Sequence, residues 1–195
     1  MKRLLITASL AASALVPSAA YAQAIPAAVI AVVDLNKVTL DCNSCKTAQA
    51  ALRAQVTSYQ SRETTLAGPL QTEQKSIQAA IDALNGKEPD AALKARVTAF
   101  QTRQQQAAQE LQRQQAQIQA NSDYVKKQIG DKLGPIYTQV MQRRGANVMV
   151  EIENTLASGA NLDVTNDVVA ALNTALPTIV TTAPAAARTT QPQGR

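Results

Sequence analysis

Apolar side chains between residues 46 and 144 recur at alternating steps of four and three, which is typical of a helix packed along a partner helix. A sequence that ends helices and turns the chain, Asn85 to Pro89, divides this region into two halves. The pattern therefore predicts two antiparallel helices with a tip at about 85–89, the second helix being the longer. The first half carries the repeat at Leu52, Val56, Tyr59, Glu63, Leu66, Leu70, Glu73, Ile77, Ala80 and Leu84. The second half carries it at Leu93, Val97, Phe100, Gln104, Ala107, Leu111, Gln114 and Ile118, and further on at Val125, Ile129, Leu133, Ile136 and Val140.

The seam between these two helices is only weakly apolar. Ten of the twenty residues from Gln101 to Ala120 are Gln, so each layer buries less apolar area than in a stiff coiled coil. A Gly-Pro pair lies inside each helix, where Pro removes one hydrogen bond and clashes with the preceding turn. We therefore expect a flexible arm with a hinge at each pair, although ordinary kinks without a functional role fit equally well. The four hinge residues are Gly68, Pro69, Gly134 and Pro135.

Segments rich in β-branched residues lie on either side of the helical region. One at Ala28–Leu35 and one at 147–153 each predict a short strand, and Thr165 is suited to cap a last short helix. This order predicts an α+β protein in which a long antiparallel helical hairpin, packed as a coiled coil, projects from a small β-containing body. The predicted parts are body 23–45, arm 46–144, body 145–176, and a tail at 177–195 whose Pro, Thr, Ala and Gln content indicates disorder.

Residues 1–22 have the features of a signal peptide. Lys2 and Arg3 precede an uncharged apolar run, and Ala20-Tyr21-Ala22 fits cleavage after Ala22. The run has about 13 residues, fewer than the roughly 17 to 25 that span a bilayer. We expect an exported chain that begins at Gln23; an N-terminal anchor that is not cleaved is the alternative.

The composition excludes most catalytic chemistry. The sequence has no His and no Trp, which rules out histidine-based triads and histidine metal sites. It also lacks the G-x-x-x-x-G-K-[ST] loop that binds nucleotide phosphates. We therefore predict a protein that is not an enzyme and has no cofactor and no metal site.

Positive charge is concentrated on the predicted arm. Residues 46–144 hold 14 basic and 8 acidic side chains, net +6, whereas the exported chain as a whole carries +3. Four basic residues near the tip are candidate contacts for anionic lipid, lipopolysaccharide or an acidic protein surface: Lys75, Lys87, Lys94 and Arg96. A solvated helix face is the alternative for each of them. Nucleic acid is excluded as a partner, because the compartment is wrong and no aromatic platform accompanies these residues.

The two cysteines, Cys42 and Cys45, form a C-x-x-C motif at the start of the first long helix. In an exported chain they most simply form a local disulfide, whose small loop gives a modest gain in stability. Thiol-disulfide exchange is the alternative, because a helix N-terminus lowers a thiol pKa, but the surrounding chain lacks the alternating strands and helices of a thioredoxin-like domain. A zinc site would need two further ligands, and with no His in the chain these could come only from carboxylates or from another subunit.

Four segments around the hairpin resemble the Skp/OmpH family of periplasmic chaperones for outer-membrane proteins. They occur in the family's order and extend over nearly all of the exported chain to about Leu176. The segments are IAVVDLNKV at Ile30–Val38, LGPIYTQV at Leu133–Val140, RGANVMVEI at Arg144–Ile152 and NLDVTNDVVAALN at Asn161–Asn173. The sequence departs from the family in its cysteine pair, its two Gly-Pro pairs and its tail.

The resemblance implies a homotrimer in which three β-containing bodies form a barrel-like core and three arms surround a cavity. It implies an ATP-independent periplasmic holdase that captures unfolded outer-membrane proteins. The four basic residues near the tip, which the charge pattern singles out, are the expected client or lipid contacts. Trimerisation also has a physical reason, because two or three short strands cannot bury their apolar residues alone. Those residues are Val29, Ile30, Val32, Val33, Val148 and Val150. A thiol-disulfide exchange protein and a non-catalytic envelope scaffold are the alternative functions.

Overall fold

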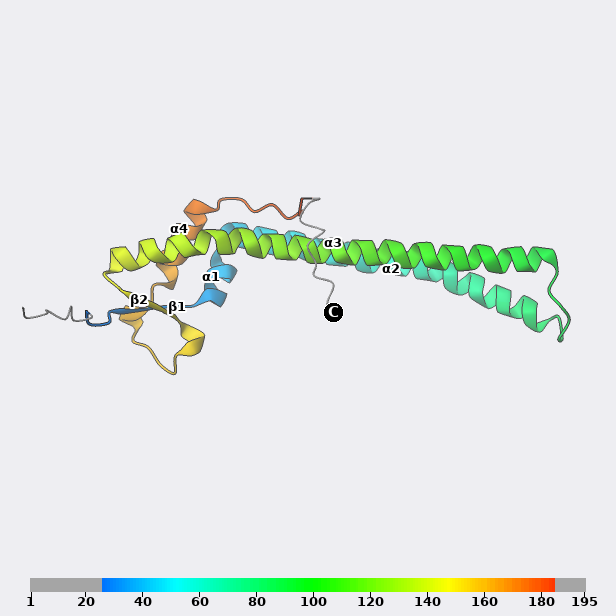
Figure 1. Cartoon of the computed structure of the whole chain (residues 1–195), viewed down its shortest axis with the longest axis horizontal. Helices are drawn as coiled ribbons and strands as arrows, with labels where there is room; N and C mark the ends of the chain where they lie inside the picture. The colour runs from blue at the N-terminus through cyan, green and yellow to red at the C-terminus, as the bar shows by residue number, and fades with distance from the viewer. Residues whose placement is uncertain (1–25, 185–195) are drawn as a thin grey trace, which may run out of the picture.

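The protein consists of a long two-helix arm on a small body (Figure 1). The computed structural model describes residues 26–184, so the predicted signal peptide lies outside the described residues. The helix-dominated chain with one small sheet agrees with the predicted α+β class. In chain order the elements are β1 (Ile30–Val33), α1 (Leu35–Asp41), α2 (Asn43–Asp82), α3 (Ala91–Arg144), β2 (Val148–Glu151), two 3-10 turns (Ile152–Asn154 and Ala160–Leu162) and α4 (Thr165–Ala175).

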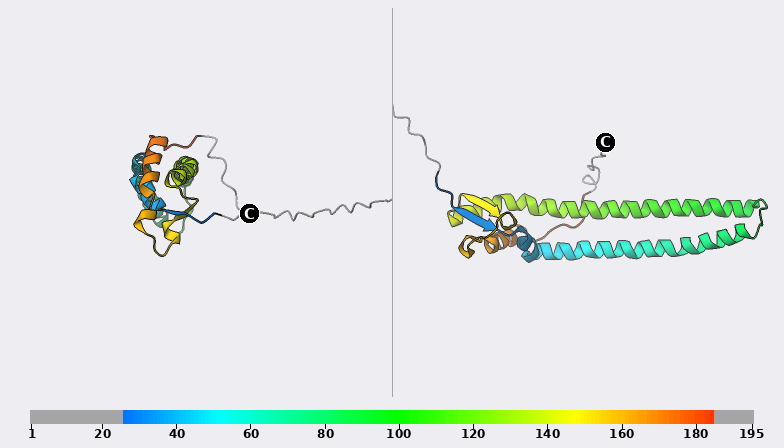
Figure 2. Two further views of the ribbon diagram at one scale, coloured as in Figure 1. Left: turned by 90° about the vertical axis from the view of Figure 1, so that its left-hand side faces the viewer. Right: turned by 90° about the horizontal axis from the view of Figure 1, so that it is seen from below.

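The arm is made by α2 and α3, which lie side by side in opposite directions (Figures 1 and 2). α2 has 40 residues and α3 has 54, so α3 extends past the start of α2 into the body. At the body end, Gly145 adopts the left-handed conformation with φ 66° and closes α3 after a last turn that carries Arg143 and Arg144.

The turn that joins the two arm helices includes the predicted tip at about 85–89. α2 ends at Asp82, and the chain turns through two residues of positive φ, Asn85 at 48° and Gly86 at 85°. α3 then begins at Ala91, where the Asp90 side chain accepts the Leu93 N–H at 2.8 Å and so caps the helix.

Neither Gly-Pro pair interrupts its helix. Pro69 lies inside continuous α2 and Pro135 inside continuous α3. α2 curves over the half of the arm nearer the tip, whereas α3 is nearly straight (Figures 1 and 2). A Pro inside a helix removes one backbone hydrogen bond and favours curvature of this kind. Whether the pairs act as hinges stays a prediction.

The sheet has two parallel strands, with Ile30 opposite Val148 and Val33 opposite Glu151. Both strands are shorter than predicted. Parallel strands need a long crossover connection, and here the whole arm provides it. The sheet is extended by an isolated bridge from Val32 to Asp163, supported by the Val164 N–H donating to the Val32 carbonyl at 2.9 Å.

Two features of the body differ from the sequence analysis. Leu35–Asp41 forms the helix α1, which the sequence analysis did not predict, and the Asp34 side chain caps it by accepting the Lys37 N–H at 2.8 Å. The prediction that Thr165 caps the last helix is wrong. Thr165 is already the first residue of α4, and its hydroxyl instead accepts the Asp34 N–H at 2.9 Å.

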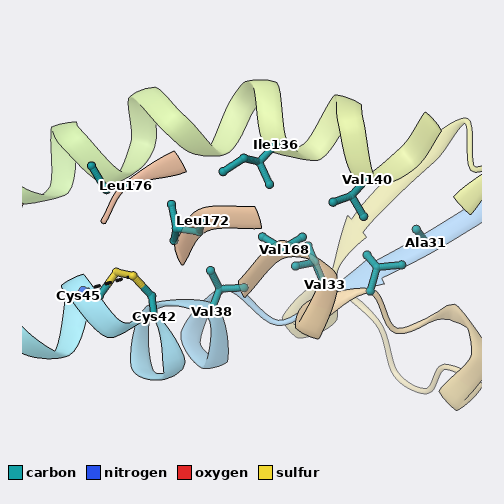
Figure 3. Packing of buried hydrophobic residues seen from close by; sticks show 11 residues of the cluster. Ala31, Val33, Val38, Cys42, Cys45, Ile136, Val140, Val168, Leu172 and Leu176 are labelled. Atoms are coloured by element: carbon teal, nitrogen blue, oxygen red, sulfur yellow. Dashed lines mark hydrogen bonds between the residues drawn. A yellow bond between two sulfur atoms is a disulfide. The ribbon is translucent and has the colours of Figure 1, made fainter. Parts of the chain in front are cut away.

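The core of the body joins α1, the base of α3 and α4 (Figure 3). Val38, Val140, Val168 and Leu172 have no exposed surface. They come from all three helices, so the core fixes the base of the arm to the body. The buried members of the cluster are Ala31, Val33, Val38, Cys42, Cys45, Ile136, Val140, Val164, Val168, Leu172 and Leu176.

The segment after α4 also has a defined course. The prediction of a disordered tail from Pro177 is wrong for residues 177–184, which run from the end of α4 along the arm (Figure 1). The Ala183 side chain is 1% exposed. The remaining residues of the predicted tail lie outside the described part of the chain.

Candidate functional site

The seam of the arm is apolar only in places, which sets what the arm can bind. Ile77, Phe100 and Ala107 are buried along it. Val56, by contrast, is 41% exposed, and Glu63 is exposed to solvent. The arm therefore presents scattered apolar side chains rather than a continuous packed stripe.

A crevice of about 250 Å³ opens at the middle of the arm, between α2 and α3. Leu66, Pro69 and Leu70 form its apolar side on α2. Small Ala107 faces them from α3, where a larger side chain would fill the gap, and Arg103 and Glu110 also line the crevice. The crevice therefore combines an apolar wall on α2 with charged groups on α3.

Ion pairs connect the two helices where the seam is weak. Arg62 on α2 makes a two-bond pair with Glu110 on α3, with Nε to Oε1 at 2.6 Å and Nη2 to Oε2 at 3.1 Å. Arg96 Nε donates to Glu73 Oε1 at 2.7 Å, and its Nη2 donates to the Ser76 hydroxyl at 2.8 Å. Hydrogen bonds from these arginines lower the pKa of Glu73 and of Glu110 below the ordinary glutamate value.

The four basic residues proposed as contacts near the tip have different surroundings. Arg96 is engaged with Glu73 and Ser76 inside the arm, and Lys94 pairs with Glu88. Lys75 and Lys87 are exposed, and neither forms an ion pair with any other residue between 26 and 184. The cations most available to a ligand near the tip are therefore Lys75 and Lys87.

The cysteine pair forms a disulfide that lies in the core (Figure 3). Cys42 and Cys45 are both buried, and the Cys42 Sγ accepts the Cys45 N–H at 3.2 Å, which caps α2. The residues between them hold the end of α4. The Ser44 hydroxyl donates to the Leu176 carbonyl at 2.6 Å, and the Asn43 N–H donates to Asn173 Oδ1 at 2.8 Å.

Such burial favours a structural role for the disulfide, because exchange requires a sulfur that a thiolate can approach.

Within residues 26–184 no group of three or more Cys, Asp or Glu side chains is placed to hold a metal ion.

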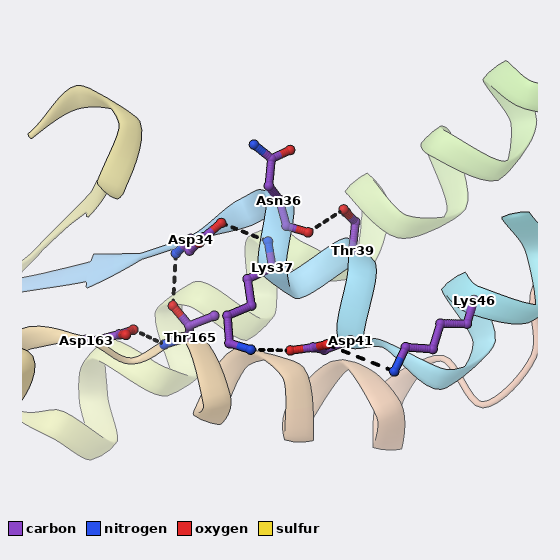
Figure 4. A network of polar contacts seen from close by, with 8 residues as sticks. All are labelled: Asp34, Asn36, Lys37, Thr39, Asp41, Lys46, Asp163 and Thr165. Carbon is purple, nitrogen blue, oxygen red and sulfur yellow. Dashed lines mark hydrogen bonds and ion pairs between the residues drawn. The ribbon is translucent and has the colours of Figure 1, made fainter.

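A polar network joins β1, α1 and α4 on the body (Figure 4). Asp34 caps α1, while its own N–H donates to the Thr165 hydroxyl. The Thr165 N–H donates to Asp163 Oδ1 at 2.8 Å. Hydrogen bonds from Thr165 hold the pKa of Asp163 below its usual value. The network fixes the start of α1 and the start of α4 to the end of β1.

Three side-chain amides were missed by the sequence analysis: Gln55 on α2 and Asn121 and Gln128 on α3. They hold the segment after α4 against the base of the arm. The sequence does contain one indication of this contact. Asn121 lies three residues after Ile118 and four before Val125, at a position where the repeat requires an apolar residue. It is 4% exposed, and both its Oδ1 and its Nδ2 are hydrogen-bonded.

The edge of the sheet keeps apolar side chains in contact with solvent. Val29, Ile30 and Val148 are 49%, 43% and 39% exposed, whereas Val32 and Val33 are buried within the single chain. Leu156, in the loop after β2, is fully exposed. Apolar residues gathered at a strand edge are typical of an interaction surface.

None of the helices between residues 26 and 184 has the length and apolar character needed to cross a membrane.

Comparison with known proteins identifies the family. A family model for outer membrane protein (OmpH-like) matches residues 29–172, from just before β1 into α4. The crystal structure of an OmpH-like protein from Caulobacter crescentus CB15, a candidate outer membrane chaperone, is similar with a TM-score of 0.65 and 18% sequence identity. The similarity covers 80% of this chain and 90% of that one. No curated protein matches.

The structural similarity, at this low identity, shows a shared fold, and the family match spans the sheet, the arm and most of α4. Both agree with the segments that carried the resemblance in the sequence. The chain therefore belongs to the Skp/OmpH family, whose members are chaperones of outer membrane proteins and not enzymes.

Proposed function

We propose that this protein is an ATP-independent periplasmic holdase that captures unfolded outer-membrane proteins between the arms of a homotrimer. The observation that carries the proposal is the arm itself: two helices of 40 and 54 residues joined by a weakly apolar seam and projecting from a small body. Family membership supports the client class.

Unfolded outer-membrane proteins expose alternating apolar side chains and unpaired backbone groups, so they aggregate in water. A holdase lowers this hazard by surrounding the client with many weak contacts. Scattered apolar side chains such as Val56, the mid-arm crevice and the abundant Gln side chains suit contacts that do not depend on one client sequence. Nothing in such a mechanism requires nucleotide hydrolysis.

Three chains are proposed because of the exposed strand edge. Val29, Ile30 and Val148 lose contact with water if the sheets of neighbouring bodies associate, and closure of three bodies into a barrel removes the unpaired edges. Three arms that point the same way then enclose a space. Lys75 and Lys87 are the groups that would contact anionic lipid or lipopolysaccharide near the arm tips.

A light-scattering assay tests the proposal. A urea-unfolded transmembrane β-barrel protein is diluted into buffer with residues 23–195 of this chain, and we expect its aggregation to be suppressed at one trimer per client without nucleotide. Deleting the arm would remove the base of α3, which is part of the body core, so the control is an equal mass of an unrelated exported protein. Undiminished scattering would instead favour the envelope scaffold, which has no affinity for clients.

A further inference from the structure

Residues 177–184 form a strap, the name used here for this segment, that lies along the base of the arm in the direction of α2. Its start is fixed to the body, since the Leu176 side chain is buried and its carbonyl accepts the Ser44 hydroxyl. Further along it reaches Ala183, whose side chain is 1% exposed. The strap is therefore anchored by the burial of Leu176 and Ala183 at its two ends, while most of the side chains between them are exposed.

The polar contacts of the strap are made by its backbone and not by its polar side chains, while the Ile179 side chain packs against the body core. Gln128 contacts both backbone groups of Val180: the Val180 N–H donates to Oε1 at 3.0 Å, and Nε2 donates to the Val180 carbonyl at 2.8 Å. Gln55 Nε2 donates to the Thr181 carbonyl at 3.2 Å. The Ala183 N–H donates to Asn121 Oδ1 at 2.8 Å.

Gln55, Asn121 and Gln128 form what we call the amide row. Two of its members are connected, because Asn121 Nδ2 donates to Gln55 Oε1 at 2.8 Å, while Gln128 lies one step of seven residues further along α3. Each amide has both a donor and an acceptor, so it complements the repeating N–H and C=O groups of any extended chain. No contact in the row depends on which side chain the bound segment carries, apart from the small size required at Ala183.

The spacing of the amide row matches an extended polypeptide. Asn121 and Gln128 are seven residues apart on α3, which is about 10.5 Å along a helix. Val180 and Ala183 are three residues apart, which is about 10 Å in an extended chain. The same step of seven towards the tip leads to Gln114, another amide at the seam of α3. The row therefore continues in the direction in which a longer extended segment would run.

From this geometry we propose that the amide row is a binding site for extended polypeptide backbone, that the strap occupies it in the free chaperone, and that an extended segment of an unfolded client displaces the strap. This inference rests on the proposed holdase function and specifies one site and binding mode for it. A site that binds backbone suits clients of unrelated sequence. A tethered occupant of similar chemistry keeps the site covered until a client competes for it.

Hydrogen exchange in the full chain (residues 23–195) gives the primary test. The amide protons of Val180 and Ala183 are expected to be protected in the free protein and to lose protection by at least fivefold when a urea-unfolded transmembrane β-barrel protein is bound. Amide protons of Val140 and Leu172 in the body core serve as internal controls and keep their protection. Unchanged protection of Val180 and Ala183 at saturating client would overturn the proposal while leaving capture itself intact.

A second test uses the strap sequence as the probe. A fluorescent peptide of sequence PTIVTTAP is titrated into the full chain carrying Ala183→Asp, in which the buried charge expels the strap. We expect at least fivefold tighter peptide binding than to the matched control Thr182→Asp, where the same charge is placed on an exposed residue. Adding Gln128→Ala removes two hydrogen bonds to the peptide and is expected to weaken peptide binding by at least fivefold, because one such bond contributes roughly fivefold to an affinity. Adding Gln119→Ala, an exposed amide outside the row, has no effect.

The two tests separate this inference from the holdase function. If the client is captured but Ala183→Asp and Thr182→Asp bind the peptide equally, the amide row is only a structural clasp and the inference fails alone. If the client is not captured at all while the peptide still binds Ala183→Asp and depends on Gln128, the proposed function fails and the backbone site stands.

Discussion

The turn between Cys42 and Cys45 joins α1, α2 and α4 through four consecutive residues. The disulfide lies in the core, the Cys42 Sγ caps α2, and Ser44 holds the Leu176 carbonyl. A disulfide that closes so small a loop removes little entropy from the unfolded chain. Its contribution therefore comes as much from the cap and the buried sulfur atoms as from the covalent bond.

We predict that the variant Cys42→Ala/Cys45→Ala lowers the free energy of unfolding by about 2 kcal/mol, because both the cap and the cross-link are lost. Urea denaturation measures this change, and the unsubstituted chain in reducing agent is the matched control for the bond alone. Suppression of client aggregation is expected to be retained below the melting temperature. A variant that keeps its fold and oligomeric state but protects no client would argue for thiol chemistry instead.

At the scale of elements, substitution of Gly68 in α2 tests whether the arm requires a flexible position inside this helix. Its backbone is helical, and no atom outside its own helix turn lies within 4 Å of a Cβ placed there. Ala fits this position without a clash. Gly68→Ala is therefore predicted to raise the free energy of unfolding by roughly 0.5 to 1 kcal/mol, the difference in helix propensity.

The same substitution at Gly145 is the matched control, because φ 66° there disfavours any residue with a Cβ. Gly145→Ala is expected to lower stability by about 1 kcal/mol, so the two variants should move urea midpoints in opposite directions. A destabilised Gly68→Ala would mean that α2 must flex at this residue, as a hinge requires.

How far the sequence predicts each element depends on where its stabilising contacts come from. The long helices follow from a repeat sustained over tens of residues, and the end of α3 follows from Gly145, so both are local signals. α1 has only seven residues and contains Val38 and Thr39, which favour strands. It is helical because Val38 is buried in the body core, where α1 packs against α4, a contact that no local pattern reveals.

The candidate site divides in the same way. Cys42 and Cys45 are neighbours in sequence, so their pairing could be anticipated. The strap could not, because Val180 is held by Gln128, 52 residues earlier, and Ala183 by Asn121, 62 residues earlier. Its run of β-branched residues, Thr178 to Thr182, favours an extended chain. Whether such a run is ordered depends on partners far away in the sequence. The Arg62–Glu110 pair likewise requires the register between α2 and α3.

At the scale of the whole molecule, the body of a single chain exposes apolar side chains on its sheet. A single arm cannot enclose a cavity. Ile30 and Val148 are opposite each other in the sheet, and both are exposed in the single chain. A charge at such a position costs little in the monomer but is strongly unfavourable once the edge is covered by a neighbouring body. Substitution at this edge therefore separates assembly from folding.

We predict that Val148→Lys keeps the helical content of the chain but raises the dissociation constant of the proposed trimer at least tenfold, as measured by sedimentation across a range of concentrations. The matched control is Val56→Lys, which adds the same charge at a valine of similar exposure on the arm and is expected to sediment as the unsubstituted chain does. Client protection should fall with assembly in Val148→Lys, because a single arm encloses no space. If Val148→Lys sediments like the unsubstituted chain, the strand edge is not the surface that brings the subunits together. If it dissociates and still protects the client at equal chain concentration, capture depends on the individual arm and not on a cavity among three.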